Sequence, residues 1–431
     1  MTRPSKLMNR HFLLIWQGQS VSQMGSQAFA IAMMLWIKHA TDSATLMGTL
    51  MMASSLPAVI LGPIGGTFAD RHSRRKIVIF SDVLSGIAVL SLAGLLFLAP
   101  DTLEMSIVWL FLVAVSLAVV SSFFRPAIAA AIPDLVPEDK IAAANSLNQF
   151  SIQFSMFIGQ GTGGVLFRLL GAPVMFLIDG LTYLFSAFSE SFIDIPQVIP
   201  EKSNQWREKF AEFKQDTVEG FHYIWGRTGL KILFLAAAFV NFFSIPISVL
   251  LPFYVEDFLK VSTDWYGFLL AAFGVGAVIG YLLAGLIKLP GKLRSHLMMM
   301  ALLGESITLG SLGVVNPAHI PITVILILMM VVGAINGFLA INFITVLQIA
   351  IPSEIRGRVF GLLGTLSGSI SPIAMGLSGV VADLLNQNIP LIYAICGGFM
   401  ALLTIMVSIS REFRDFLAYE PVDKQPSVIP G

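Results

Sequence analysis

The sequence contains few charged residues. Asp, Glu, Lys and Arg make up 12% of its 431 residues, about half of the roughly 25% found in soluble domains. Apolar residues form long blocks instead, and each block exceeds the roughly 18 to 20 residues that cross the hydrocarbon core of a bilayer. This pattern excludes an ordinary soluble protein and predicts an all-α polytopic membrane protein.

Cysteine is almost absent as well. The single cysteine, Cys396, lies in an apolar block, which excludes an intramolecular disulfide and a multi-cysteine metal site. The 26 basic and 26 acidic residues cancel, so charge gives no argument for binding nucleic acid. The sequence also lacks the P-loop pattern G-x-x-x-x-G-K and paired histidine ligands, so we expect no direct use of ATP, no metal or cofactor and no enzyme activity.

Twelve apolar blocks predict twelve membrane spans, at about residues 12–37, 45–69, 77–98, 106–130, 141–167, 173–193, 231–255, 264–287, 297–315, 320–350, 358–384 and 389–410. Among the basic residues, only Lys38, Arg168 and Lys260 fall in odd-numbered loops, and Arg125 lies within a span. The other 22 of the 26 therefore lie on the side of the termini. Because basic loops stay in the cytoplasm, both termini are predicted to be cytoplasmic.

The spans divide into two six-helix halves. We predict an N-terminal half at 1–195, a cytoplasmic linker at 196–230, a C-terminal half at 231–410 and a cytoplasmic tail at 411–431. Linker residues recur at three- and four-residue steps, namely Trp206, Phe210, Phe213, Thr217, Phe221 and Ile224. This spacing predicts an amphipathic helix on the cytoplasmic headgroups, with a partner-binding helix as the alternative.

The two halves share landmarks at a constant spacing of 215 residues. The matched pairs are Gly65 and Gly280, Pro137 and Pro352, Gly161 and Gly376, and Gly164 and Gly379. An ordered series without gaps indicates a parallel internal repeat. Parallel six-helix repeats place a binding site between the halves near the middle of the membrane.

The loop between spans two and three concentrates charge. Residues 65–76 read G-G-T-F-A-D-R-H-S-R-R-K, with four cations and one carboxylate between two apolar blocks. The loop resembles the signature of the major facilitator superfamily, which is matched at Gly66, Asp70, Arg71, Arg74 and Arg75, with Ser73 in place of a second glycine. The resemblance covers the whole chain and implies a twelve-helix transporter that works by alternating access.

Within that superfamily, the chain is most similar to bacterial drug:proton antiporters of the macrolide-efflux type. The stretches that carry this similarity are G-P-I-G-G-T-F-A-D-R-H-S-R-R-K, F-F-R-P-A-I-A-A-A-I-P-D-L-V-P, F-L-I-D-G-L-T-Y-L-F-S-A and V-E-G-F-H-Y-I-W. The similarity implies export of small amphipathic compounds from a bacterial cytoplasm, across the cytoplasmic membrane, in exchange for protons. A facilitator or importer of a metabolite or lipid is one alternative, and a non-transporting scaffold or sensor is another.

The charged loop is a candidate gate. Asp70 falls near the C-terminus of span two, where the helix dipole disfavours a carboxylate and favours cations. It therefore needs a positive partner, from the loop arginines or from the N-terminus of span eleven. The resemblance implies that such contacts hold one access state. The candidate gating residues are Gly65, Gly66, Asp70, Arg71, Arg74, Arg75 and Lys76. The alternative is a basic loop that only sets topology.

Charged residues within spans are candidates for binding substrate or protons. By the family's arrangement, spans one, four, seven and ten line the cavity, which ranks Arg125 first, with snorkelling to the cytoplasmic interface as its alternative. Glu305 falls near the midplane and is predicted to be either a proton site or a neutral acid hydrogen-bonded within its own half. Asp82, Asp179 and Glu190 fall near the interfaces, where we expect scaffold or snorkelling roles.

Polar residues on the cavity spans suit a neutral or amphipathic substrate. They are Gln17, Ser20, Gln23 and Gln27 in span one, Asn241 and Ser244 in span seven, and Asn336 and Asn342 in span ten. Small residues in spans five and eleven predict close packing, a sliding hinge, or both. The residues in question are Gly159, Gly161, Gly163, Gly164, Gly364, Gly368, Pro372, Gly376 and Gly379.

Overall fold

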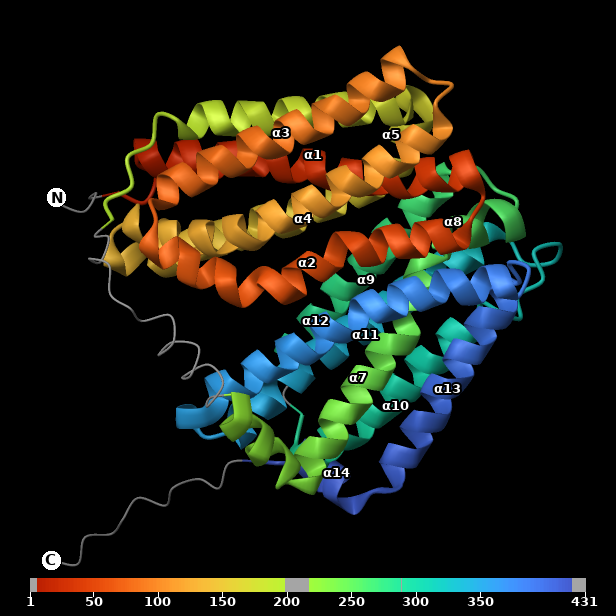
Figure 1. The fold of residues 1–431 in the computed structure, drawn as a ribbon. Helices are drawn as coiled ribbons and strands as arrows, with labels where there is room; N and C mark the ends of the chain where they lie inside the picture. Colours follow the sequence, from red (N-terminus) through yellow and green to blue (C-terminus); the bar gives the residue numbers. More distant parts are fainter. Residues whose placement is uncertain (1–5, 198–216, 288, 421–431) are drawn as a thin grey trace, which may run out of the picture. The chain divides into compact units, whose positions relative to one another are not determined.

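The structure is a computed structural model that describes residues 6–197, 217–287 and 289–420. Within these ranges the chain is helical and contains no strand (Figure 1). The long helices are α1 (Arg10–Thr41), α2 (Ala44–Arg71), α3 (Arg74–Leu98), α4 (Leu103–Asp134), α5 (Ile141–Glu190), α7 (Thr228–Val249), α9 (Asp264–Leu286), α10 (Gly291–Ser311), α11 (Ile322–Ala350), α12 (Ser353–Leu384) and α13 (Ile389–Ile409). Short helices are η1 (Glu138–Lys140), α8 (Leu251–Phe253), the π-helix η2 (Tyr254–Phe258) and α14 (Arg411–Leu417).

The long helix α5 consists of two legs. Gly171 has φ 73° and ψ 164°, a backbone conformation outside the helical region that glycine adopts at no steric cost, and Pro173 follows two residues later. Counting the legs separately, the described helices account for the twelve predicted spans. Nine helices of the described chain are long and apolar enough to cross a membrane, and one of these contains both legs of α5.

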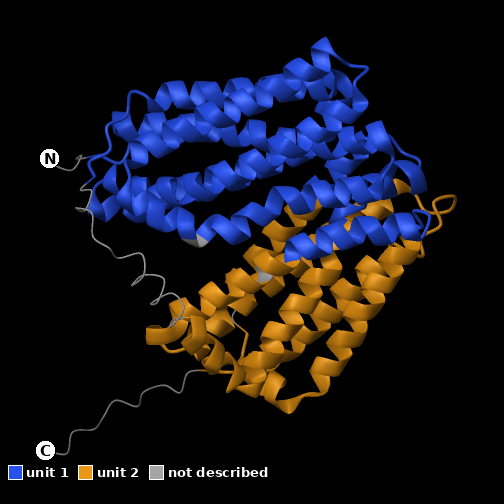
Figure 2. Cartoon of the chain, viewed as in Figure 1, with its two compact units in different colours: residues 1–203, 248–271, 371–389 blue, residues 204–247, 272–370, 390–431 orange. Residues whose placement is uncertain are grey.

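Two compact units make up the chain (Figure 2). Unit 1 comprises Met1–Ser203, Ser248–Ala271 and Ser371–Ile389. In it, α1 packs along α5, α3 packs against α4 and α5, and α2 packs against α4. One apolar cluster joins these helices and includes Phe12, Ile15, Ala69, Ile128 and Leu135.

Unit 2 comprises Asn204–Ile247, Ala272–Ile370 and Pro390–Gly431. Its apolar cluster includes Leu233, Met298, Val346 and Phe413, from α7, α10, α11 and α14. The first part of the predicted tail is thus a packed helix, and the Arg294 guanidinium of α10 fixes its end by donating to the carbonyl oxygens of Leu417 (3.1 Å) and Tyr419 (2.6 Å). The boundaries of the halves inferred from the sequence remain a prediction.

The two halves repeat one helix crossing. In unit 1, a Cβ on Gly65 of α2 would lie 1.9 Å from the Ser122 carbonyl oxygen of α4. In unit 2, a Cβ on Gly280 of α9 would lie 2.1 Å from the Ala334 carbonyl oxygen of α11 and 2.7 Å from the Phe338 nitrogen. Adding 215 to 122 gives 337, within the same turn of α11. Both crossings therefore need glycine for the same reason, which agrees with the predicted pseudo-repeat.

The predicted linker helix is described only in part. Trp206, Phe210 and Phe213 lie outside the described residues. Residues 217–225 are helical, and Ile224 is buried in the apolar cluster of unit 2. Phe221 stacks on Trp225 with ring centroids 4.3 Å apart, and each residue is about half exposed.

Candidate functional site

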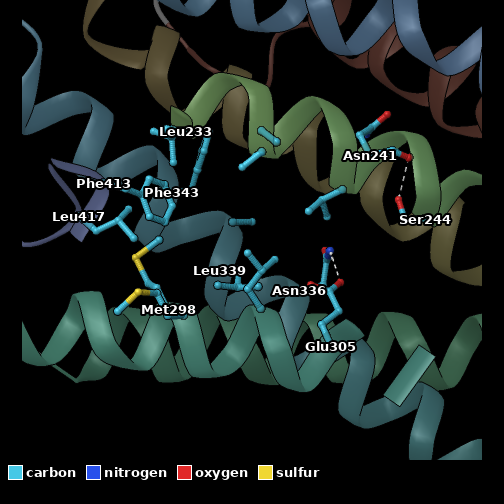
Figure 3. A pocket seen from close by; sticks show the side chains of 16 residues that line it. Leu233, Asn241, Ser244, Met298, Glu305, Asn336, Leu339, Phe343, Phe413 and Leu417 are labelled. Carbon is cyan, nitrogen blue, oxygen red and sulfur yellow. Dashed lines mark hydrogen bonds between the residues drawn. The ribbon is translucent and has the colours of Figure 1, made fainter. Parts of the chain in front are cut away.

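Unit 2 contains a cavity of about 260 Å³ between α7, α10, α11 and α14 (Figure 3). Most of its wall is apolar, formed by residues that include Leu233, Met298, Leu339, Phe343, Phe413 and Leu417. Glu305 and Asn336 lie together at the other end, and Asn241 and Ser244 line the α7 side near them. The cavity therefore has an apolar end and a polar end.

The carboxyl group of Glu305 is the acidic group in this cavity. Its side chain is 4% exposed, and the Asn336 amide donates a hydrogen bond of 3.2 Å to its Oε1 (Figure 3). The structure thus shows a hydrogen bond within one unit, as one of the two sequence-based alternatives requires. A role as proton site remains a prediction, as does substrate binding by Asn241 and Asn336. Asn342 does not line the cavity, because its amide donates to the Phe338 carbonyl oxygen.

Unit 1 contains a second cavity, of about 390 Å³, between α1, α3, α4 and α5. Gln23 and Gln27 line it, whereas Gln17 and Ser20 do not. Gln17 donates to the Ser189 hydroxyl (3.3 Å), and Ser20 donates to the Trp16 carbonyl oxygen. A substrate-binding role for the predicted face of α1 remains a prediction. The lining residues of α1 are Gln19, Ser22, Gln23, Ser26 and Gln27. Their spacing of three and four residues places them on one side of an α-helix.

Three carboxyl groups are buried in unit 1, which excludes snorkelling and leaves the other expected role, in the scaffold, as a prediction. Asp82 is 2% exposed, while Asp179 and Glu190 are each 1% exposed. Asp82 lines the cavity. Sequence reasoning placed these residues correctly along their helices but not around them, because α3 and α5 are apolar on every side and their pattern does not show which side faces the protein.

Gln19 connects two of these carboxyl groups and was not predicted as a site residue. Its amide nitrogen lies 2.7 Å from Glu190 Oε1, 3.4 Å from Asp82 Oδ2 and 3.2 Å from the Ser186 hydroxyl. Asp179 lies on the same leg of α5, where a Cβ on Gly25 would come within 2.6 Å of its Oδ1. The absence of a side chain at Gly25 therefore lets α1 approach Asp179.

Arg125 also lines the unit 1 cavity. Its side chain is exposed, and its Nε donates to the Ser121 hydroxyl one turn earlier at 3.1 Å. Its role towards a substrate remains a prediction.

The charged loop is anchored through Arg74. The guanidinium forms an ion pair with Asp134 at the end of α4, donates to the Ala130 carbonyl oxygen (3.0 Å), and lies 4.0 Å from Asp70. Asp134 was not predicted. The local pairing of Asp70 with a loop arginine is present, whereas the gating role of the loop remains a prediction.

Neighbouring loop residues have other contacts. Arg75 donates to the Ser191 carbonyl oxygen, and Gln197 accepts from the Arg74 backbone nitrogen at 2.9 Å. Gly65 serves helix packing, while a Cβ on Gly66 would meet nothing within 4 Å.

Unit 1 has a second set of ionic contacts, between the C-terminal end of α1 and the π-helix η2, which the sequence did not predict. Lys38 is 5% exposed and lies 2.9 Å from Glu256 Oε2 and 3.0 Å from Asp257 Oδ2. His39 and Thr263 also contact the Glu256 carboxylate. Burial opposes ionisation of Glu256, but its hydrogen bonds with His39, Thr263 and Lys38 outweigh this and lower its pKa to about 2.

Several of the predicted small residues of α5 and α12 are packing positions in unit 1, whereas a Cβ on Gly364, in unit 2, would meet nothing within 4 Å. A Cβ on Gly159 would lie 2.4 Å from Gln27 Cβ, one on Gly164 would lie 2.6 Å from the Thr263 carbonyl oxygen, and one on Gly376 would lie 2.8 Å from Met52 Sδ. Gly161 has more room, with Ala271 Cβ at 3.3 Å. The helix α12 continues through Pro372. A hinge at these residues remains a prediction.

The fold, with a cavity in each unit that holds polar side chains, defines a multi-pass membrane protein of the transporter type. Comparison with known families gives a match to the Major Facilitator Superfamily over residues 15–375. The chain therefore belongs to this superfamily, as the loop motif indicated.

Among characterised relatives, the chain is 24% identical over 381 residues to macrolide efflux protein A of Streptococcus pyogenes, which covers 88% of this chain and 90% of the relative. It is 26% identical over 341 residues to the multidrug efflux pump Tap of Mycolicibacterium fortuitum, covering 77% and 79%. Efflux proteins are thus among its relatives, at low identity.

Solved structures agree with the fold. The nucleoside transporter NupG superposes with a TM-score of 0.67 at 13% identity, covering 96% of this chain and 100% of NupG. A D-xylose–proton symporter gives 0.66 at 17% identity, covering 92% and 96%. At such identities, the likeness concerns the fold alone.

Proposed function

We propose that this transporter exports small amphipathic molecules from a bacterial cytoplasm in exchange for protons, with both termini in the cytoplasm. The observation that carries the proposal is the unit 2 cavity, where the buried Glu305 carboxyl lies at the polar end of a mostly apolar wall. Relatives named as macrolide and multidrug efflux proteins support the direction of transport and the substrate class.

The cavity fits a molecule with an apolar body and a single polar group. Ligand sites are mostly apolar and contain a few polar groups that fix orientation. The carboxyl of Glu305 and the amide of Asn336 provide such groups. Met298 and Met299 line the apolar wall, and flexible methionines adapt to substrates of different shape. One site can therefore accept several related compounds.

The energy source in this proposal is the proton gradient. Moving one elementary charge through a membrane potential of 100 mV is worth about 2.3 kcal/mol. For a neutral substrate exchanged with one proton, this corresponds to an accumulation ratio of roughly 50-fold, since about 1.4 kcal/mol is a factor of ten.

Everted membrane vesicles with an acidified lumen test the proposal. Addition of a macrolide or a lipophilic dye should release protons from the lumen and drive uptake of the compound. Glu305→Gln should raise KM about tenfold, because a hydrogen bond to a charged group contributes about 1.5 kcal/mol or more. Glu104→Gln, at an exposed position in the first turn of α4, is the matched control and should behave as wild type.

Two results would contradict the proposal. The first is the absence of both proton release and uptake for every compound tested. The second is uptake of the compounds by intact cells and not by everted vesicles, which would indicate an importer.

A further inference from the structure

Two buried carboxyl groups meet where α1, α3 and the second leg of α5 pack together. The Gln19 amide nitrogen lies 3.4 Å from Asp82 Oδ2 and 2.7 Å from Glu190 Oε1, so the two carboxyl groups share one donor. A carboxylate is only an acceptor, and two nearby carboxylates disfavour each other's ionisation. Two buried carboxyl groups that share one amide are therefore favoured to hold at least one proton between them.

The donors around the pair are too few to hold two carboxylates. The Gln19 amide reaches both groups, and the Ser186 hydroxyl lies 3.4 Å from Glu190 Oε1. No described residue donates to Glu190 Oε2, although this atom is fully buried. Like charges at such a separation disfavour ionisation of both groups. A proton supplies the missing donor.

Other titratable groups near the pair come from each packed helix. Asp179 and Tyr183 lie on the same leg of α5, and Tyr183 shares a hydrogen bond of 2.9 Å with Ser26 of α1. On α4, Arg125 lines the same cavity as Asp82. The pair therefore lies near a further carboxyl group and a phenol on α5 and near the guanidinium of Arg125 on α4.

Protons can reach the pair through the unit 1 cavity. Asp82 lines this cavity of about 390 Å³ together with Gln23 and Arg125, whereas Glu190 is not part of its lining. Asp82 is thus the member of the pair that the cavity reaches. A polar cavity of this size holds water, and water conducts protons to a carboxyl on its wall.

We propose that the Asp82–Glu190 pair is a proton-binding site that couples transport to the proton gradient. This proposal rests on the proposed function. The pair takes up one proton on one side of the membrane and releases it on the other, alternating between a neutral form with two protons and a form of charge −1 with one. No other bond forms or breaks. Gln19 is a positioning residue, because its amide holds both carboxyl groups.

Asp82→Asn and Glu190→Gln test the proposal, with Asp101→Asn in an exposed loop as the matched control. In everted vesicles, each test variant should lose the stimulation of uptake by a lumen-acid gradient, which is roughly 50-fold at 100 mV for one proton. Exchange of labelled for unlabelled substrate without a gradient should stay within about twofold of wild type, because this exchange needs no proton transfer. Gradient stimulation that persists in both variants would overturn the proposal.

Infrared spectroscopy of the purified protein gives an independent measurement that does not depend on the substrate. The wild type should show the band of a protonated carboxyl group at pH 7, and this band should shift in Gln19→Ala. Gln19→Ala is the milder substitution and serves if Asp82→Asn and Glu190→Gln fail to fold. A spectrum that is the same in wild type and Gln19→Ala would overturn the proposal. If no compound is transported but the band shifts, the proposed function fails while the proton site stands.

Discussion

Replacement of Glu256 should test the ionic contacts between the C-terminal end of α1 and the π-helix η2. Its carboxylate contacts Lys38, His39 and Thr263, and its pKa is lowered from 4.5 to about 2. One pKa unit corresponds to about 1.4 kcal/mol. We therefore expect Glu256→Gln to lower the free energy of unfolding at pH 7 by about 3 kcal/mol.

The pH dependence follows from the direction of the shift. The folded-state pKa lies below the unfolded value, so the unfolded chain binds more protons between pH 2 and pH 4.5. The stabilisation is complete above about pH 5 and is lost as the pH falls through 2. The difference between wild type and Glu256→Gln should accordingly be constant from pH 5 to 7 and shrink below pH 4.

Denaturant unfolding in mixed micelles, followed by tryptophan fluorescence, measures this difference. Glu104→Gln is the control for the loss of one carboxylate and should unfold like the wild type. Lys38→Met should cost less than Glu256→Gln, because Glu256 keeps His39 and Thr263 as partners. If Glu256→Gln matches the wild type within about 0.5 kcal/mol at pH 7, the contacts add nothing to stability and the reasoning is refuted.

Three further substitutions have definite expected outcomes. Gly65→Ala and Gly280→Ala should each lower the free energy of unfolding by about 1–3 kcal/mol, because the new Cβ meets backbone atoms of the neighbouring helix. Gly66→Ala is the control and should leave it unchanged. Unchanged unfolding of both test variants would show that the helices can move apart. Arg74→Ala should leave membrane insertion intact and slow transport, and exchanging the charges of Arg74 and Asp134 should restore part of the transport rate. Full transport activity of Arg74→Ala would mean that the loop only sets topology.

The fold was predictable because its signals are local. Long apolar blocks define spans in any sequence, and the break in α5 follows from Gly171 and Pro173. The depth of a residue in the membrane was equally predictable, because each residue of a helix adds about 1.5 Å of rise. Glu305 was therefore identified as a deep carboxyl before its contact with Asn336 was visible.

The direction in which a side chain points was not predictable in the same way. A helix that faces lipid on one side and protein on the other is apolar on both, so its pattern fails to distinguish them. This is why the sequence did not show that Asp82 and Glu190 face the interior of unit 1, or that Gln19 lies between them. Contacts between distant segments were equally out of reach, as with Arg74 and Asp134, which are separated by 60 positions.

The internal repeat shows which kinds of contact can be recognised by comparing positions 215 residues apart. Positions 168 and 383 are 215 residues apart, and in unit 1 the side chain at each position forms a hydrogen bond with a residue at the start of another helix. Arg168 Nε donates to Asp264 at the start of α9 (2.9 Å), and Asp383 accepts from the backbone nitrogen of Thr45 at the start of α2 (2.8 Å). One position is basic and the other acidic, so sequence comparison misses their equivalence. Gly65 and Gly280 are both glycine where a Cβ would meet backbone atoms of a neighbouring helix, and so are Gly164 and Gly379. Arg168 and Asp383 contact a helix start with opposite charges, because Arg168 binds an acidic side chain and Asp383 accepts from a backbone nitrogen. The repeat therefore reveals packing, while coupling and substrate residues must be sought within each half separately.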